Sequence, residues 1–174
     1  MFAKFNEMKK LFSLFIIVLT LGSCSDDVQF NNESVFQGVK NNEFWQGSEA
    51  KATVTPTTLT LQAVTFTETI TIVVPLPQVV VDPKNENTFI THLLGVSNNK
   101  KAIFTIKDDS GLVRTYETGI GEEDGQVVIS EFDGATVSGT FRFNAYNIDE
   151  DADEDDFVNF QNGVFYKVAV ATAP

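Results

Sequence analysis

From Ser34 onward, apolar and polar residues alternate along short segments rich in Thr, Val and Ile, which is the pattern of strands with one buried face. The alternation is clearest over residues 136–145, where one face carries Val137, Gly139, Phe141, Phe143 and Ala145. No segment in this part repeats apolar residues every 3.6 positions over the length of a helix. We therefore predict an all-β fold, a single antiparallel β-sandwich or flattened barrel of about eight to ten strands.

Two asparagine pairs mark the expected tight turns. Asn41-Asn42 predicts a hairpin between residues 35–39 and 43–46, because asparagine tolerates positive φ. Asn162-Gly163 predicts a second hairpin between residues 157–161 and 164–170. In the last of these strands, one face is expected to carry Val164, Tyr166, Val168 and Val170.

A second pattern precedes the β-rich part. Lys9 and Lys10 come directly before the apolar run of residues 11–21, which ends in Gly22-Ser23-Cys24. Spanning a bilayer takes about 20 apolar residues, so a run of 11 is too short to remain as an anchor. Charge order, length and small-residue exit predict a cleaved signal peptide helix over residues 1–23, with translation beginning at Met1 or at Met8.

Cys24 is the only cysteine in the chain and stands where a lipoprotein signal is cut. Leu21-Gly22-Ser23-Cys24 resembles the bacterial lipobox, in which the thiol receives a diacylglyceryl group and the peptide is cleaved before the cysteine. The lipid on Cys24 would then hold the protein on a membrane, because each buried methylene contributes roughly 0.8 kcal/mol. The expected organisation is signal peptide 1–23, lipidated cysteine and flexible tether 24–33, and all-β domain 34–174.

Three residues after the cysteine bear on the address. Ser25-Asp26-Asp27 resembles the acidic export signal of Bacteroidota lipoproteins, which directs them to the outer face of the outer membrane. The alternative is an ordinary charged linker. We expect an exported protein that is lipid-anchored to the outer membrane and exposed at the cell surface, with anchoring toward the periplasm as the other orientation.

Charge and composition exclude several classes of partner and site. The formal net charge is −12, and loss of Lys4, Lys9, Lys10 and Glu7 with the signal peptide makes it −14. Such a charge argues against nucleic acid, whose phosphates need Lys and Arg. With Cys24 modified and His92 the single histidine, thiolate and histidine-rich metal sites cannot form within the chain. We therefore expect no cofactor, and a structural rather than catalytic His92.

Several segments together resemble an uncharacterised family of small Bacteroidota outer-membrane lipoproteins. They are Phe36-x-x-Val39 with Trp45, residues 125–133, Val137-Ser138-Gly139-Thr140-Phe141-x-Phe143, and Asn162-Gly163-x-Phe165. The chain departs from that pattern by having Asn41-Asn42 in the first hairpin in place of Asn-Gly, and by a long acidic insertion. The resemblance implies localisation to the outer membrane and a β-fold, and it implies no activity.

The acidic insertion, residues 149–156, holds seven acids in eight positions. Calcium takes 6–8 oxygen ligands, so such a run invites a calcium interpretation. An EF-hand loop would need glycine where Glu154 stands and glutamate where Phe160 stands. We expect a solvated loop, with weak calcium association and binding of a specific basic partner as the alternatives.

These patterns predict a non-enzymatic, membrane-anchored lipoprotein whose β-domain binds or organises material at the cell envelope. Exposed Thr, Asn and aromatic positions suit a glycan or a protein ligand, whereas Trp45 is expected in the core. The alternative is an accessory subunit or hydrolase acting on extracellular polysaccharide or protein. That alternative requires two carboxylates facing each other across a cleft.

Overall fold

The computed structural model describes residues 34–80, 84–85, 88–95, 97–119, 124–149 and 156–173. The predicted signal peptide, Cys24, the tether and residues 150–155 of the acidic run lie outside them. The chain divides at Asn31 and Asn32, and every described residue belongs to the second unit. The strands in these ranges are β1 (Val35–Lys40), β2 (Glu43–Gln46), β3 (Glu49–Val54), β4 (Thr58–Val64), β5 (Glu68–Pro75), β6 (Ile90–Leu94), β7 (Lys101–Lys107), β8 (Val113–Glu117), β9 (Gly125–Phe132), β10 (Thr136–Asn147) and β11 (Phe157–Thr172).

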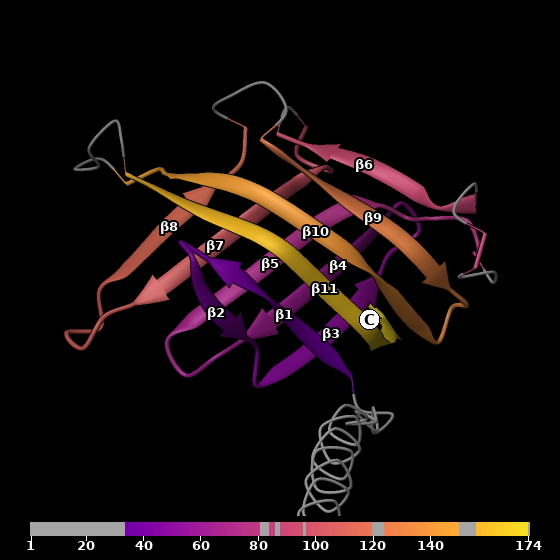
Figure 1. Ribbon diagram of the computed structural model, residues 1–174, viewed down its shortest axis with the longest axis horizontal. Coiled ribbons are helices and arrows are strands. Elements are labelled where there is room, and N and C mark those ends of the chain that lie inside the picture. Colours follow the sequence, from indigo (N-terminus) through magenta and orange to yellow (C-terminus); the bar gives the residue numbers. More distant parts are fainter. Residues whose placement is uncertain are drawn as a thin grey trace, which may run out of the picture. The chain divides into compact units, whose positions relative to one another are not determined.

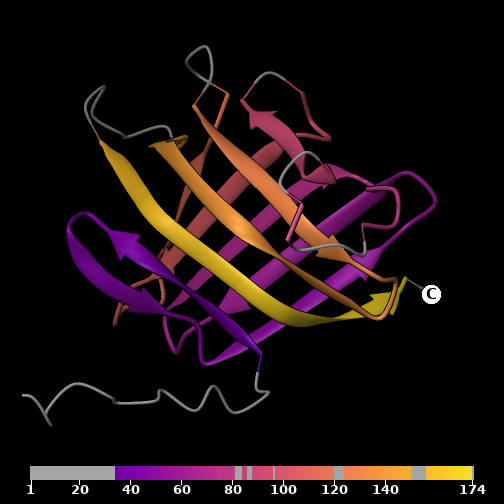
Figure 2. The same ribbon diagram turned by 45° about the vertical axis from the view of Figure 1, so that its right-hand side comes forward.

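Hydrogen bonds link the 11 strands into one continuous sheet that folds into two layers. The first layer has the order β2-β1-β11-β10-β9-β6, and the second has the order β3-β4-β5-β7-β8. Figures 1 and 2 show β10 and β11 crossing over β3, β4, β5 and β7. The all-β prediction is thus confirmed, with one strand more than the upper estimate.

The two layers are hydrogen-bonded to each other at two corners. The end of β11 passes beyond β1 and pairs in parallel with β3, at Val170 with Ala52. The end of β10 passes beyond β9 and pairs with β8, at Tyr146 with Glu117. The domain is therefore a sandwich closed at two corners. We expected an antiparallel sheet, but the sheet is mixed, because β11 and β3 pair in parallel.

The first predicted hairpin is confirmed, and the second is wrong. Asn41 and Asn42 have φ of 49° and 70° and join β1 to β2 in a two-residue turn. Asn162, with φ of 50°, lies inside the continuous strand β11. There β11 has one extra residue relative to both β10 and β1, which makes Asn162-Gly163 a β-bulge.

A second bulge changes which face of β11 is buried. Lys167 has φ of 48°, and β11 again carries one residue more than β10. The predicted apolar face is consequently wrong at Val164 and Tyr166, which point outward, while Phe165 and Val168 are fully buried. Each bulge shifts the alternation of a strand by one position, so a single period of two cannot describe β11.

Aromatic rings fill the space between the layers. Phe160 from β11 contacts Phe143 at 4.9 Å, Phe104 at 5.5 Å and Trp45 at 5.8 Å between ring centroids. Trp45 is 5% exposed, which confirms it as a core side chain. Its indole Nε1 donates to Glu68 of β5, and the same carboxylate pairs with Lys40 of β1. The packing and this polar link hold the first layer against the second.

No helix in the described ranges combines the length and the apolar character needed to cross a bilayer.

Candidate ligand-binding face

The outer surface of β9, β10 and β11 carries an ordered array of polar and aromatic side chains. Alternation places the interior residues of β10 against the core and leaves its other residues on the outside, Arg142 exposed and Asn144 and Tyr146 half-buried. On β11, Phe157 and Asn159 lie on the same outer side, because Val158 and Phe160 are buried. We call this surface the β9–β11 face and define it by Gln126, Arg142, Asn144, Tyr146, Phe157 and Asn159.

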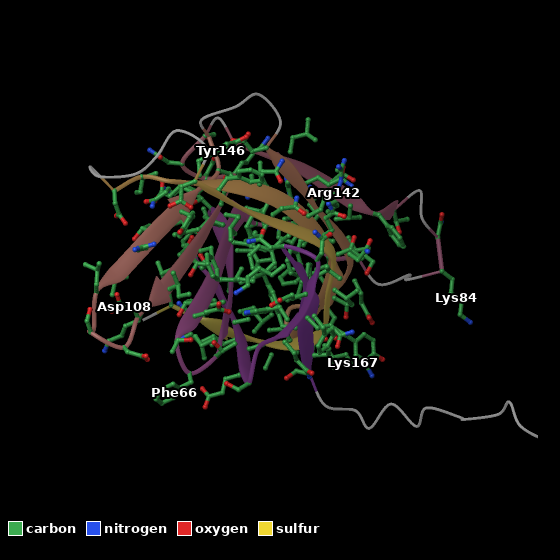
Figure 3. The ribbon with its side chains drawn as sticks, turned by 60° about the vertical axis from the view of Figure 1, so that its left-hand side comes forward. Phe66, Lys84, Asp108, Arg142, Tyr146 and Lys167 are labelled. Atoms are coloured by element: carbon green, nitrogen blue, oxygen red, sulfur yellow. The ribbon has the colours of Figure 1, made fainter. Side chains whose placement is uncertain are left out.

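Cross-strand register arranges these six side chains in three consecutive pairs. Gln126 of β9 is opposite Arg142, Asn144 is opposite Asn159, and Tyr146 is opposite Phe157. Successive pairs are two residues apart along β10, about 6.7 Å at the rise of an antiparallel strand. In Figure 3, Arg142 and Tyr146 are both labelled along β10, away from the turn that carries Phe66.

Each pair is held by a direct contact. The Arg142 Nη2 donates to Gln126 Oε1 at 3.1 Å, and the Asn159 Nδ2 donates to Asn144 Oδ1 at 2.6 Å. The rings of Tyr146 and Phe157 lie 5.8 Å apart at 37°. These contacts restrict the side-chain rotamers before any ligand arrives, which lowers the entropic cost of binding.

Two depressions of about 410 Å³ and 400 Å³ hollow this face. They share Arg142 and Asn162, and Gln161 and Thr140 extend their polar lining. The bulge contributes to their shape, because Gly163 lacks a side chain and Asn162 leaves the regular strand. The turn residue Asn41 supports the adjoining backbone, since its Oδ1 accepts from the Asn159 N–H at 2.9 Å.

Asp124 brings a carboxylate to the edge of the first depression. It is 7% exposed, and its Oδ2 accepts from the Gly119 N–H. Its own carbonyl accepts from the Asn144 N–H at 2.7 Å, which connects it to the β9–β11 face. Within the described residues, no three His, Cys, Asp or Glu side chains gather as a metal-binding group.

The residues singled out in the sequence lie elsewhere. His92 is half-buried on the edge strand β6, facing Val127 of β9, and its pKa lies below the usual 6.5, first because of burial and then because Lys100 is near.

Of the acidic run, Asp149 and Asp156 are described. The Asp156 Oδ2 accepts from Asn147 at 2.7 Å and from the Tyr116 hydroxyl at 3.4 Å.

Burial and the nearby Asp156 carboxylate raise the Tyr116 pKa. The hydrogen bonds of Asp156 with Asn147 and Tyr116 connect the end of the acidic run to the corner where β8 meets β10. The prediction for residues 150–155 stays a prediction, because they lie outside the described ranges.

The β9–β11 face was not identified from the sequence, although one signal for it was present. Alternation in residues 136–145 already placed Arg142 and Asn144 on the outer side of their strand. Asn159, the partner of Asn144, was hidden by the mistaken hairpin, which separated residues 157–161 from the strand that continues beyond Gly163.

Comparison with known proteins places most of the chain in one family model. Residues 32–169 match a family described as a domain of unknown function, DUF6252. No curated protein and no solved structure shows significant similarity to the chain.

Proposed function

Because the chain belongs to the DUF6252 family, whose function is unknown, we propose a function from its own residues. The protein is an exported Bacteroidota lipoprotein, anchored to the outer membrane through a lipid on Cys24 and exposed at the cell surface. Its β-domain binds a glycan or a protein through the β9–β11 face, without catalysis and without a cofactor. The depressions of that face, lined by paired hydrogen-bonding side chains, are the observation that carries this proposal.

The anchor is supported by the order of residues at the start of the chain. Lys9 and Lys10, the apolar run and the small residues Gly22 and Ser23 precede the single cysteine. A thiol is the nucleophile that the thioether-forming reaction needs, and a hydroxyl at this position would not serve. Ser25-Asp26-Asp27 supports surface exposure over a periplasm-facing domain.

Binding is favoured over hydrolysis by the kind of side chain that lines the depressions. Glycosidic hydrolysis generally uses two carboxyl groups about 5–9.5 Å apart across the scissile bond. Of the described carboxylates, Asp124 is the one that lines the depressions, and its oxygen already accepts from Gly119. Amides and a guanidinium hold polar ligands without transferring protons at neutral pH.

Fractionation of cells that express the full chain tests the anchor and the address. We expect the protein in the outer-membrane fraction, labelled by fatty acid, and cleaved when protease is added to intact cells. Cys24→Ser should abolish the label and move the protein to the soluble fraction, while Ser23→Ala, a small residue beside the cysteine, should leave both unchanged. A Cys24→Ser protein that stayed in the membrane would refute the anchor, and protease resistance on intact cells would refute surface exposure.

A further inference from the structure

We propose that the β9–β11 face binds an uncharged glycan, with Tyr146 and Phe157 against a sugar ring and the two polar pairs bonded to sugar hydroxyls. This inference rests on the proposed binding function and specifies the class of ligand. Its basis is the order of the three pairs along the strands, one aromatic and two polar.

The aromatic pair forms an exposed end to the array. Phe157 is 48% exposed, whereas the other phenylalanines of β10 and β11, Phe141, Phe143, Phe160 and Phe165, are buried. Its ring and that of Tyr146 stay in contact at 5.8 Å, so they present one extended apolar surface. Aromatic faces carry a negative quadrupole, which suits the polarised C–H groups on one side of a pyranose ring.

The neighbouring pairs match the other property of a sugar, its adjacent hydroxyl groups. A hydroxyl donates one hydrogen bond and accepts two, and an amide side chain offers two donors beside an acceptor. The Asn144–Asn159 bond uses one donor of Asn159 and one acceptor site of Asn144. Further donor and acceptor capacity on these two amides is therefore left for a ligand that has both kinds of group.

Spacing allows a ligand longer than one ring. The distance along β10 between the aromatic pair and the Gln126–Arg142 pair is four residues, or about 13 Å at the rise of a strand. The two depressions begin at the Asn144–Asn159 pair and continue past Arg142 to Thr140 and Val164. An extended saccharide lying along β10 would thus meet the aromatic surface first and the polar pairs next.

Charge decides between neutral and acidic glycans. Arg142 is the cation that lines both depressions, and Asp124 at the edge of the first opposes it. The whole chain carries a formal charge of −12, so a polyanion would be repelled on approach. A single guanidinium also serves a neutral sugar, because its N–H groups donate readily to hydroxyl oxygens.

Native electrophoresis of the full chain in detergent, through gels that contain a polysaccharide, tests the class of ligand. The neutral probes are xylan, mannan, arabinogalactan, a soluble α-glucan and a soluble β-glucan, and polygalacturonate is the acidic probe. We expect at least one neutral polymer to slow the protein and polygalacturonate to leave its mobility unchanged, and retardation by polygalacturonate alone would overturn the assignment to an uncharged glycan. Phe157→Ala and Asn159→Ala should each weaken that retardation about fivefold, the size of one lost stacking contact or hydrogen bond.

Two variants on the outer side of the other layer serve as controls. Lys51→Ala and Gln62→Ala remove long polar side chains from β3 and β4, beside another depression of about 150 Å³. Both should leave the retardation unchanged. If they weaken it as much as Phe157→Ala and Asn159→Ala do, or if no neutral polymer slows the protein, the glycan assignment is overturned.

A capture experiment separates failure of the glycan class from failure of the binding function. Immobilised full chain and its Phe157→Ala/Asn159→Ala variant are incubated with the same envelope extract, and the captured material is treated with periodate or protease. Material lost from the variant and destroyed by periodate supports the glycan. Material lost from the variant but destroyed by protease alone overturns the glycan and keeps the binding function, while equal capture by both proteins overturns both.

Discussion

Gly163 shows how closely single residues are constrained inside β11. A Cβ at this position would lie 2.6 Å from three ring carbons of Phe141, well inside van der Waals contact. The neighbouring Asn162 needs positive φ to make the bulge, which asparagine adopts more easily than most residues. The pair Asn-Gly is thus required for two separate reasons, one of backbone conformation and one of space.

Gly163→Ala should lower the free energy of unfolding by about 1–3 kcal/mol, because the methyl group forces the Phe141 ring out of place. Urea denaturation measures this cost. In a Phe141→Leu background the same substitution should cost less, since the ring that it meets is gone. An equal cost in both backgrounds would show that the ring is not what excludes a side chain at Gly163.

His92 is a titratable residue in an unfavourable environment for its polar ring. Its Nε2 is buried and has no hydrogen-bond partner in the described part of the chain. Burial and then Lys100 lower its pKa below 6.5, so the unfolded chain holds the proton more tightly than the fold does. With His92 neutral above about pH 6.5, the free energy of unfolding keeps its full value. It decreases as the pH falls toward the lower pKa of His92 in the folded state, because protonation favours the unfolded chain.

Replacing His92 should flatten this pH dependence. Urea denaturation between pH of about 7.5 and about 5.5 should show a falling free energy of unfolding for the natural chain and a smaller fall for His92→Leu, which cannot be protonated. Asp133 lies in an exposed turn, where hydrogen bonds from the N–H groups of Thr136 and Ala135 lower the pKa of its carboxyl, so Asp133→Asn should keep the natural slope. An unchanged slope in His92→Leu would contradict the assignment.

At the scale of elements, the two layers are joined by a polar contact as well as by the rings. Glu68 of β5 pairs with Lys40 of β1 and accepts from the indole of Trp45 on β2. Its side chain is 11% exposed, against 27% for Glu117, which pairs with Lys101 at 2.9 Å on the outside of the second layer. The two ion pairs thus have similar chemistry and equally exposed lysines, and they differ in the burial of the glutamate.

Glu68→Gln should cost about 2 kcal/mol, because the Glu68 carboxylate is the more buried of the two and serves both the Lys40 ammonium and the Trp45 indole. Glu117→Gln, the matched change at the outer pair, should cost about 0–1 kcal/mol. Replacing Lys40 and Glu68 together by methionine should recover part of the loss, since no charge then stays unpaired. Equal costs for the two glutamates, measured by urea denaturation, would mean that the inter-layer pair adds nothing beyond a surface contact.

The elements also show where the sequence was ambiguous. Asn41-Asn42 and Asn162-Gly163 both predicted positive φ, and both contain it. In the first case the chain reverses, whereas in the second it continues, because β10 pairs with β11 on both sides of Asn162-Gly163, from Phe157 to Ala169. A dipeptide determines its own dihedral angles, while the choice between turn and bulge depends on hydrogen bonds to residues far along the chain.

Charge is a property of the whole molecule. The chain has 24 acidic and 12 basic residues, and such an excess destabilises a compact state by self-repulsion. Seven of the acids lie in residues 149–156. Calcium association there would raise Tm more than magnesium does, whereas a solvated loop would respond equally to both cations.

Raising NaCl from about 0.05 M to about 0.5 M should raise Tm by a few degrees, because salt screens the repulsion. CaCl₂ and MgCl₂ at matched ionic strength should then raise Tm equally, as expected for a solvated loop. A larger rise with CaCl₂, together with heat in a calorimetric titration, would establish the calcium alternative and contradict this prediction.

Much of the domain follows from local pattern. The alternation in residues 136–145, the first hairpin and the buried Trp45 depend on neighbours along the chain, and the all-β class follows from them. The lipid anchor at Cys24 is likewise a prediction from local sequence. The β9–β11 face depends instead on register, because Asn144 meets Asn159 and Tyr146 meets Phe157 only once β11 runs unbroken past Gly163 beside β10. Pairing between strands is set by the packing of the whole core, and no short stretch of sequence contains that information.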